Sequence, residues 1–167
     1  EVMLDGNVHF AGTQGVGKST VLRALLFFYN ADKMKLGIQS GQKSFEEFYF
    51  RHSNSYIVYE VRTGQSAYSI LLSRIQGKIV YRFIDAPYRK EWLLSKDGRI
   101  ESDWIRIRER IGNSVDISAK IDTYELYRNI IFGNTHDRSH RYDKYAIVES
   151  SKYHNIPRSI QNVFLNS

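Results

Sequence analysis

The stretch GTQGVGKST, residues Gly12 to Thr20, decides how the rest of the chain is interpreted. Gly12 and Gly17 enclose four residues, and Lys18 and Ser19 follow directly, which is the G-x-x-x-x-G-K-[ST] pattern of a phosphate-binding loop. Glycines let the backbone turn its N–H groups toward one anion, and a helix beginning near Lys18 adds the positive end of its dipole. The stretch therefore predicts a loop that binds the phosphates of a nucleotide.

Individual positions of this loop have distinct expected roles. Lys18 is expected to reach the β- and γ-phosphates, and Ser19 to ligate Mg²⁺ through its hydroxyl. Thr20 is expected to hydrogen-bond the α-phosphate. A solvated surface lysine and an ordinary helix N-cap are the alternatives for Lys18 and Ser19, and the glycine spacing favours the phosphate-binding roles. The candidate nucleotide contacts are Gly12, Thr13, Gln14, Gly15, Val16, Gly17, Lys18, Ser19 and Thr20.

The flanks of the loop have the strand and helix that such a loop requires. Residues 7–12, NVHFAG, are typical of a short apolar strand, and residues 19–30, STVLRALLFFYN, lack Gly and Pro and favour a helix. This helix is apolar on nearly every side, so we expect it to lie between layers of the fold. Residues 31–43 are predicted to be a polar surface loop, and Ser44 with Glu47 to cap a short helix after it.

Residues 55–85 change to the pattern of strands. Three segments, 55–61, 67–75 and 78–85, are rich in β-branched and aromatic residues and are separated by glycine-centred turns. Strands joined by such short turns must run antiparallel. The sequence therefore predicts an α/β fold with an antiparallel three-stranded meander. Three tyrosines are expected to pack on its face instead of stacking on bases: Tyr56, Tyr59 and Tyr68.

Two further helices are predicted, over residues 102–112 and 122–133, each ended by its last glycine. Ser102 is the expected N-cap of the first helix. Asp122 and Glu125 form the capping box expected at the start of the second.

The remaining segments of the second half are predicted to form a charged loop over 134–144, a strand over 145–150 and a helix or turn that begins at Pro157. His136 and His140 have a spacing that could serve a metal ion on a helix, but their charged and polar neighbours favour a surface loop.

The composition bounds the class of protein. The chain has 167 residues, enough for one domain, and its lack of cysteine excludes disulfides, thiolate metal sites and a cysteine nucleophile. It is 42% hydrophobic, and no apolar run is long enough to span a membrane. We therefore expect a soluble, cytoplasmic protein with no membrane partner. The net charge of +6 fits a polyanionic partner, although many soluble domains carry a similar excess.

Nucleotide hydrolysis requires more than the loop. A carboxylate must hold Mg²⁺ and another residue must orient the attacking water, and both usually end an apolar strand. The one candidate is IVYRFIDAP, residues 79–87, in which Asp85 ends a strand. Arg82 interrupts the apolar run and Ala86 stands where a glutamate is expected, which favours Asp85 as a turn residue before Pro87 over a metal ligand. We expect this chain to bind a nucleotide without cleaving it.

The loop GTQGVGKST followed by VLRALLFFY resembles the start of an ABC-type ATPase head, in particular the heads of SMC, MukB and SbcC-like coiled-coil proteins. In that family the loop opens a helix of this kind and an antiparallel β-subdomain follows. Gln14 stands where the family usually has Asn, which exchanges one amide for another. The runs HSNSYIVYEV at 52–61 and NIPRSIQNVFLNS at 155–167 are similar to SMC-like heads of plasmid or phage defence operons, such as the Wadjet ATPase.

This resemblance implies an α/β P-loop NTPase fold and the cofactors ATP and Mg²⁺. Residues 1–167 are then a single ATP-binding domain, the N-terminal lobe of an ATPase head, with the Walker B and signature motifs in a C-terminal part beyond a coiled coil. Gln161 is then the glutamine-loop residue that contacts Mg²⁺ and the γ-phosphate, with an exposed helical glutamine as the alternative. The implied catalytic residues are Lys18 and Gln161, and the implied metal ligands are Ser19 and Gln161.

The partners that the resemblance implies are the C-terminal lobe, a second head in an ATP-closed homodimer, accessory subunits and DNA. Arg106 and Arg110 share a helix face and are the candidate contacts to DNA phosphates. The alternative is a solvated face balanced by Glu101, Asp103 and Glu109. The implied function is ATP-driven head dimerisation on DNA, in chromosome or plasmid maintenance, repair or defence.

Two other functions stay open. A small-molecule or nucleotide kinase of this length also carries an early phosphate loop, but it requires crossover connections between parallel strands. A non-catalytic nucleic-acid-binding module predicts DNA binding that is indifferent to ATP.

Overall fold

The computed structural model describes residues 11, 13, 15, 17–30, 45–64 and 66–147. The sequence-based predictions for the strand at 7–12, for the loop and cap at 31–44 and for Gln161 lie outside these residues. The elements in chain order are α1 Lys18–Asn30, α2 Phe45–Tyr49, β1 Ile57–Thr63, β2 Ser66–Ile75, β3 Lys78–Ile84, the 3-10 helix η2 Lys90–Trp92, α3 Trp104–Ile111, α4 Tyr124–Ile131 and the 3-10 helix η3 Asp143–Tyr145.

The three strands form one antiparallel sheet in the order β1-β2-β3, which confirms the predicted meander within a mixed α/β fold. Ile75 pairs with Lys78, so only two residues connect β2 to β3. Those residues, Gln76 and Gly77, have φ values of +49° and +82°. Two consecutive left-handed residues make a turn whose twist matches that of the flanking strands, which keeps the hairpin in register.

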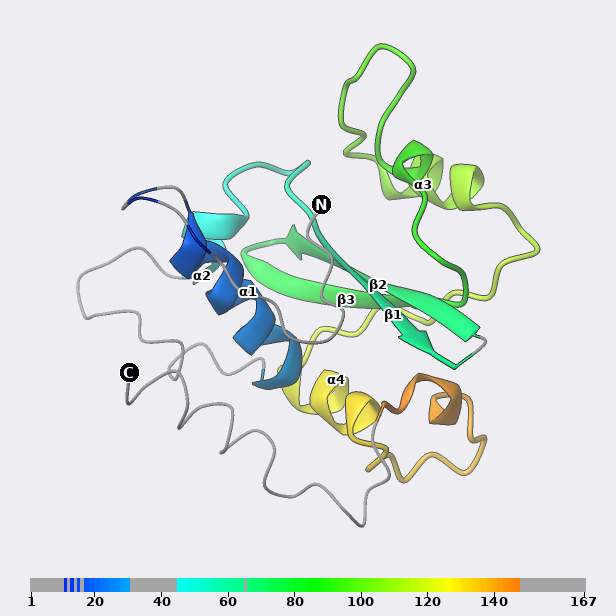
Figure 1. Ribbon diagram of the computed structural model, residues 1–167. Coiled ribbons are helices and arrows are strands. Elements are labelled where there is room, and N and C mark those ends of the chain that lie inside the picture. The colour runs from blue at the N-terminus through cyan, green and yellow to red at the C-terminus, as the bar shows by residue number, and fades with distance from the viewer. Residues whose placement is uncertain are drawn as a thin grey trace.

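Alternation along the strands gives the sheet two apolar faces, and Figure 1 shows helices on both sides of the sheet. One face carries Tyr68, Ile70 and Leu72 of β2 and packs against α1, α2 and α4 in the larger core. The opposite face carries Leu71 of β2 and Ile84 of β3 and is covered by η2 and α3. The sheet is therefore the middle layer of three, with α1 on one side and the basic helix α3 on the other.

Helix α1 forms where the sequence predicts it and packs most deeply at its C-terminal end. Phe27 and Phe28 are buried, whereas residues 20–26 are half-buried. The helix is therefore less enclosed than its apolar sequence predicts. Aromatic stacking anchors its buried end, because the Phe27 ring lies 4.2 Å from that of Phe45 in α2.

The structure corrects the predicted start of α3. Asp103, not Ser102, is the N-cap, and its carboxylate accepts a hydrogen bond from the N–H of Ile105. The backbone N–H of Ser102 bonds instead to the Glu101 carboxylate. Both residues are good caps by type, so the choice depends on where the chain leaves its extended conformation. The predicted end at Gly112 is confirmed, with φ at +97°.

The start of α4 is corrected in the same way. Thr123 is the N-cap, and its hydroxyl accepts from the N–H of Leu126, so the predicted Asp122 cap is wrong by one position. The helix ends as predicted, because Gly133 follows it with φ at +64° and donates its N–H to the Ile130 carbonyl.

The strand predicted over 145–150 does not form in its first residues. Tyr145 closes η3, and Ile147 has a single backbone bond, from its N–H to the Ile131 carbonyl, among those that the structure gives. The predicted charged loop before it is confirmed as a series of turns that leads into η3. In the part of the chain that the structure covers, no helix is both long and apolar enough to cross a membrane.

Candidate functional site

The glycines that precede α1 adopt the backbone that the sequence predicts for a phosphate loop. Gly15 and Gly17 have φ values of +89° and +92°, which other residues adopt only with strain. The first helical hydrogen bond runs from the Val21 N–H to the Gly17 carbonyl, at 3.1 Å, so Gly17 directly precedes the helix. A helix leaves the N–H groups of its first turn without intrahelical acceptors, which makes this end of α1 a set of donors.

The described residues leave room beside this turn. Apart from the chain neighbours of each glycine, no atom of the described residues lies within 4 Å of the position that a Cβ would take at Gly15 or Gly17. Thr13, Gly15 and Ser19 are exposed. Backbone N–H groups and an exposed Ser19 hydroxyl are groups that a phosphate with Mg²⁺ requires, so the described residues fit that ligand. Gly12, Gln14, Val16 and the Lys18 side chain lie outside the described part of the loop.

A tyrosine that the sequence analysis did not single out supports this turn. The Tyr49 hydroxyl of α2 donates to the backbone carbonyl of Thr20 in the first turn of α1, at 3.2 Å. Its ring stacks on Phe45, with centroids 4.4 Å apart, and burial raises the pKa of its hydroxyl. The aromatic run at 45–50 signals packing in the sequence, but the hydroxyl's partner is 29 residues away and has no local signal.

Asp85, the one candidate for a catalytic carboxylate, takes part in a structural ion cluster. Its carboxylate lies 2.8 Å from the Lys144 Nζ, which also lies 2.7 Å from the carboxylate of Asp116. The hydrogen bond from Lys144 lowers the pKa of Asp116. The Asp85 N–H also donates to the Asp116 carbonyl. These contacts connect the end of β3 to η3, which agrees with Asp85 as a turn residue.

Arg82, which interrupts the apolar run before Asp85, is buried on the sheet face that α3 covers. Its guanidinium lies over the Trp104 ring, 4.0 Å from the centroid. Burial lowers the pKa of Arg82. The interruption is therefore a packing feature of α3 on the sheet, since a guanidinium stacks well on an aromatic ring.

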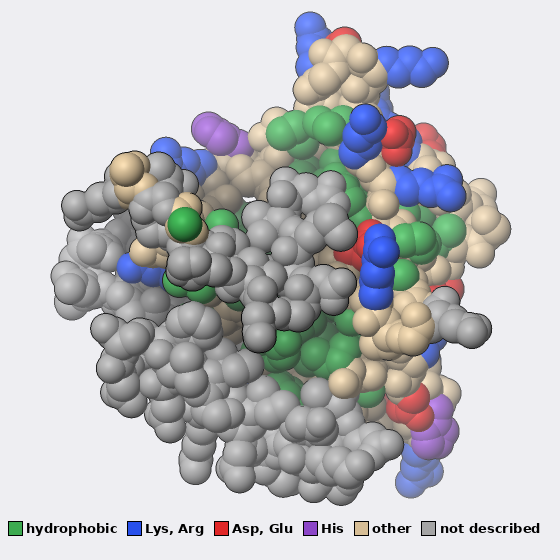
Figure 2. Space-filling view, in the orientation of Figure 1, with side chains coloured by type: hydrophobic (Ala, Val, Ile, Leu, Met, Phe, Trp, Pro, Cys, Tyr) green, Lys and Arg blue, Asp and Glu red, His purple; other side chains and the backbone are tan. Residues whose placement is uncertain are grey.

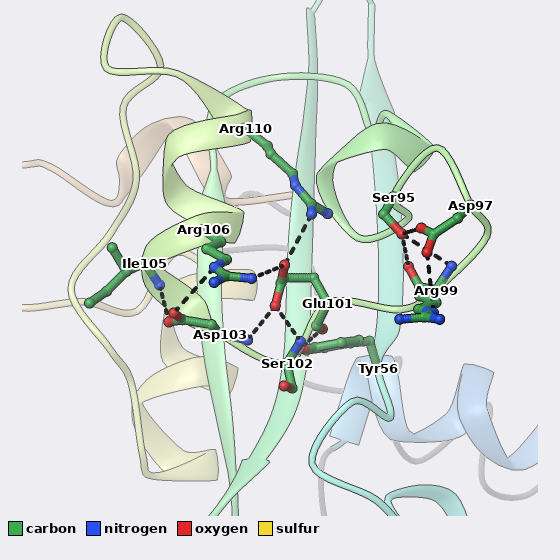
Figure 3. Close-up of polar contacts among 10 residues, drawn as sticks. All are labelled: Tyr56, Ser95, Asp97, Arg99, Glu101, Ser102, Asp103, Ile105, Arg106 and Arg110. Carbon is green, nitrogen blue, oxygen red and sulfur yellow. Dashed lines mark hydrogen bonds and ion pairs between the residues drawn. The ribbon is translucent and has the colours of Figure 1, made fainter.

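Two arginines of α3, Arg106 and Arg110, contact the carboxylate of Glu101 (Figure 3). The Arg110 guanidinium lies 3.0 Å from Glu101, and that of Arg106 lies 3.9 Å from Glu101 and 4.0 Å from Asp103. Arg99 pairs with Asp97 at 3.2 Å. The contacts match the alternative in which acidic neighbours balance this helix face.

Basic side chains are dispersed over the surface in the same way. On the face in Figure 2, Lys and Arg side chains are scattered over the described surface, and acidic side chains lie beside several of them. This face therefore presents no continuous basic stripe among the residues that are drawn in colour.

The predicted loop position of the two histidines and the predicted packing of the sheet tyrosines agree with the structure. His136 and His140 lie in the loop before η3, and His140 contacts Asp143 at 2.8 Å. No group of three metal-ligating side chains occurs among the described residues. The hydroxyls of the three tyrosines predicted to pack all donate to backbone carbonyls. Tyr56 donates to Glu101, Tyr59 to Ala24 and Tyr68 to Tyr145.

One protein family matches almost the whole chain. Its profile, described as "Protein of unknown function (DUF3584)", matches residues 1–154. The chain belongs to this family. The matched region includes residues 12–20, the meander and helices α3 and α4, and it ends before Gln161. No curated protein and no solved structure matches the chain.

Proposed function

We propose that this chain binds ATP with Mg²⁺ at the loop from Gly12 to Thr20 and is the nucleotide-binding lobe of an SMC-like ATPase that acts on DNA. The observation that carries the proposal is the positive φ of Gly15 and Gly17 directly before α1, within the pattern G-x-x-x-x-G-K-S. The antiparallel meander beyond α2 supports the same class, because ABC-type heads resemble this order of elements.

The chain's own groups have separate tasks in this proposal. Backbone N–H groups around Gly15 and Gly17 hold the β-phosphate, and Lys18 provides a positive charge toward the γ-phosphate. The Ser19 hydroxyl holds Mg²⁺, which, when bound, shields the charge of the phosphates. Gln161, as a glutamine-loop residue, adds a second contact to the metal.

Hydrolysis requires groups that the described residues do not provide. Asp85 is paired with Lys144 and is followed by Ala86. Among the described strands, none ends in an adjacent Asp and Glu. The proposal therefore assigns turnover to a C-terminal lobe and to a second head, and nucleotide binding alone to this chain. A role in plasmid or phage defence, as in the Wadjet ATPase, is the specific form of this proposal.

Contact with DNA is assigned to the more exposed of the basic side chains. The side chain of Arg106 is 69% exposed, whereas that of Arg110 is 29% exposed and paired with Glu101 at 3.0 Å. Arg106 can therefore turn to a phosphate at little cost, while Arg110 would leave a carboxylate unpaired. Replacing Arg106 by Gln should reduce DNA binding and its salt dependence, with Lys96→Gln as the control for loss of one exposed charge.

The decisive experiment is calorimetric titration of the chain with MgATP. Lys18→Ala is expected to weaken binding by about tenfold or more, because it removes a charge-assisted contact of at least about 1.5 kcal/mol. Lys96→Ala removes an exposed lysine on the far side of the sheet and should leave the dissociation constant unchanged. Equal affinity of the wild type and Lys18→Ala would refute the proposal.

A phosphate-release assay separates this proposal from the kinase alternative. The chain alone is expected to release phosphate from ATP no faster than buffer, with or without small acceptors. The meander argues against a kinase because its strands lack the crossovers of a parallel sheet. Phosphoryl transfer by the unaided chain would favour the kinase and contradict the assignment of turnover to other lobes.

A further inference from the structure

Three tyrosine hydroxyls form a ladder along α1. Tyr49 donates to the carbonyl of Thr20, Tyr59 to that of Ala24 and Tyr127 to that of Phe28, at 3.2, 2.7 and 2.7 Å. The three acceptors are four residues apart. Because a helix has 3.6 residues per turn, each carbonyl is rotated by only about 40° from the one before, so all three lie on one side of α1.

The three donors come from three different elements, which are α2, β1 and α4. Each tyrosine ring is held by another aromatic ring, with Tyr49 on Phe45, Tyr59 against Phe28 and Tyr127 on Tyr81, at centroid distances of 4.4, 4.9 and 4.3 Å. Because a tyrosine has few rotatable bonds, a ring locked in this way aims its hydroxyl at one point. The ladder therefore connects α1 to α2, β1 and α4 at defined positions.

These bonds are directional contacts rather than general packing. Burial raises the pKa of the Tyr59 and Tyr127 hydroxyls, so they stay neutral donors. The carbonyls of Thr20 and Ala24 lie within α1, so each has a second lone pair beyond the one used by the intrahelical N–H, and the tyrosine occupies it. Removing the Tyr49 hydroxyl therefore leaves the helix bond of Thr20 in place and frees α1 to shift without leaving that carbonyl unsatisfied, whereas Phe28 is in the last turn of α1, whose carbonyls have no N–H partner within the helix.

The rung at Tyr49 holds the end of α1 where apolar burial is weakest. Residues 20–26 are half-buried, while Phe27 and Phe28 are buried at the other end. The Thr20 carbonyl belongs to the residue after Ser19, in the turn that follows Gly15 and Gly17. The Tyr49 hydrogen bond therefore fixes the first turn of α1 at the end that the core encloses less.

We infer that Tyr49 is a positioning residue that couples the phosphate loop to α2 through the Thr20 carbonyl. This inference rests on the proposed nucleotide binding for its functional consequence, although the tie itself exists without nucleotide. A ligand that orders the first turn of α1 then also orders α2, and by reciprocity an ordered α2 strengthens ligand binding. Tyr127, at the far rung, has the same chemistry without this role.

The test compares Tyr49→Phe with Tyr127→Phe, which removes the same atom from the opposite end of the ladder. Amide hydrogen exchange is measured on both variants without nucleotide. In Tyr49→Phe, exchange of the amides in the first two turns of α1 is expected to rise about fivefold, the effect of one net hydrogen bond. In Tyr127→Phe the rise should be confined to the last turns of α1 and to α4. An equal response of the first turns in both variants would overturn the inference.

Titration with MgATP provides the functional readout. Tyr49→Phe is expected to weaken binding about fivefold while Tyr127→Phe stays within about twofold of the wild type. Both variants should lose a similar few degrees in the midpoint of thermal unfolding, which excludes global destabilisation as the cause. If the wild type and Lys18→Ala bind ATP equally, the nucleotide proposal fails. Hydrogen exchange alone then tests whether Tyr49 positions the first turn of α1. If the wild type binds ATP and both tyrosine variants bind equally well, the positioning role of Tyr49 is wrong.

Discussion

Replacing Lys144 by methionine is expected to destabilise the fold by about 1.5 kcal/mol at low salt. The side chains of Lys144, Asp85 and Asp116 are 39%, 44% and 70% exposed, so each ion pair has the modest value of a surface pair, about 0.2–1 kcal/mol. The two carboxylates both lie within 2.8 Å of the Lys144 Nζ, which places them at most about 5.5 Å apart. Without the lysine they repel each other by about 0.8 kcal/mol even in water.

Methionine is the suitable replacement because it keeps an unbranched apolar stem beside the Tyr145 ring, over which the Lys144 Nζ lies at 5.2 Å. Thermal unfolding followed by circular dichroism measures the effect, and about 1.5 kcal/mol corresponds to a fall of roughly 4 °C in the midpoint for a chain of this size. Salt should reduce the difference, because screening weakens both the attraction and the repulsion. Lys96→Met, at an exposed lysine, is the control and should change stability by less than about 0.5 kcal/mol.

The pH dependence has a definite sign. The pKa of Asp116 is lowered in the folded chain by its hydrogen bond from Lys144. The stability that this carboxylate contributes is therefore present above its unfolded pKa of about 3.9 and is lost as the pH falls through its folded value. The difference between the wild type and Lys144→Met should be constant near neutral pH and shrink below about pH 4.

A double-mutant cycle can refute the reasoning. Asp116→Asn in the Lys144→Met background removes the repulsion, so the double variant should be more stable than the sum of the two single changes predicts, by about 0.5 kcal/mol or more. Additive effects within about 0.3 kcal/mol would show that Lys144 and Asp116 do not interact and would refute the three-residue cluster.

Four further substitutions test three local features of the fold by chemical denaturation. Thr123→Ala should cost about 1 kcal/mol as the loss of the α4 cap, whereas Asp122→Ala should cost less than about 0.5 kcal/mol, and the reverse order would restore Asp122 as the cap. Gln76→Asn should stabilise the β2–β3 hairpin by about 0.5 kcal/mol, because Asn tolerates the left-handed backbone better; a loss of stability would contradict this. Tyr68→Phe should cost about 1 kcal/mol, since its hydroxyl bonds the Tyr145 carbonyl in the core, and no cost would show that bond to be unimportant.

The elements that the sequence predicts correctly have local signals. Glycines at 112 and 133 end helices because they adopt positive φ there, and the two-residue turn at Gln76 and Gly77 pairs the strands on either side. The positive φ of Gly15 and Gly17 is a local signal of the same kind, because glycine adopts this conformation more easily than other residues. The caps were predicted one residue too early because Ser102 and Asp103 are equally suitable by type. Which of the two is the N-cap depends on the path of the preceding chain.

What the amino-acid sequence determines by itself is therefore the sequence of elements, the antiparallel meander and the backbone of the turn before α1, since each follows from residues adjacent in the chain. Only the tertiary structure decides the partners of the polar groups. It pairs Asp85 with Lys144 across 59 residues, gathers Arg106 and Arg110 around Glu101, and aims three tyrosine hydroxyls at one side of α1. Hydrogen bonds and ion pairs depend on distances of a few ångströms between distant segments, and no local pattern of residues specifies those distances before the chain has folded.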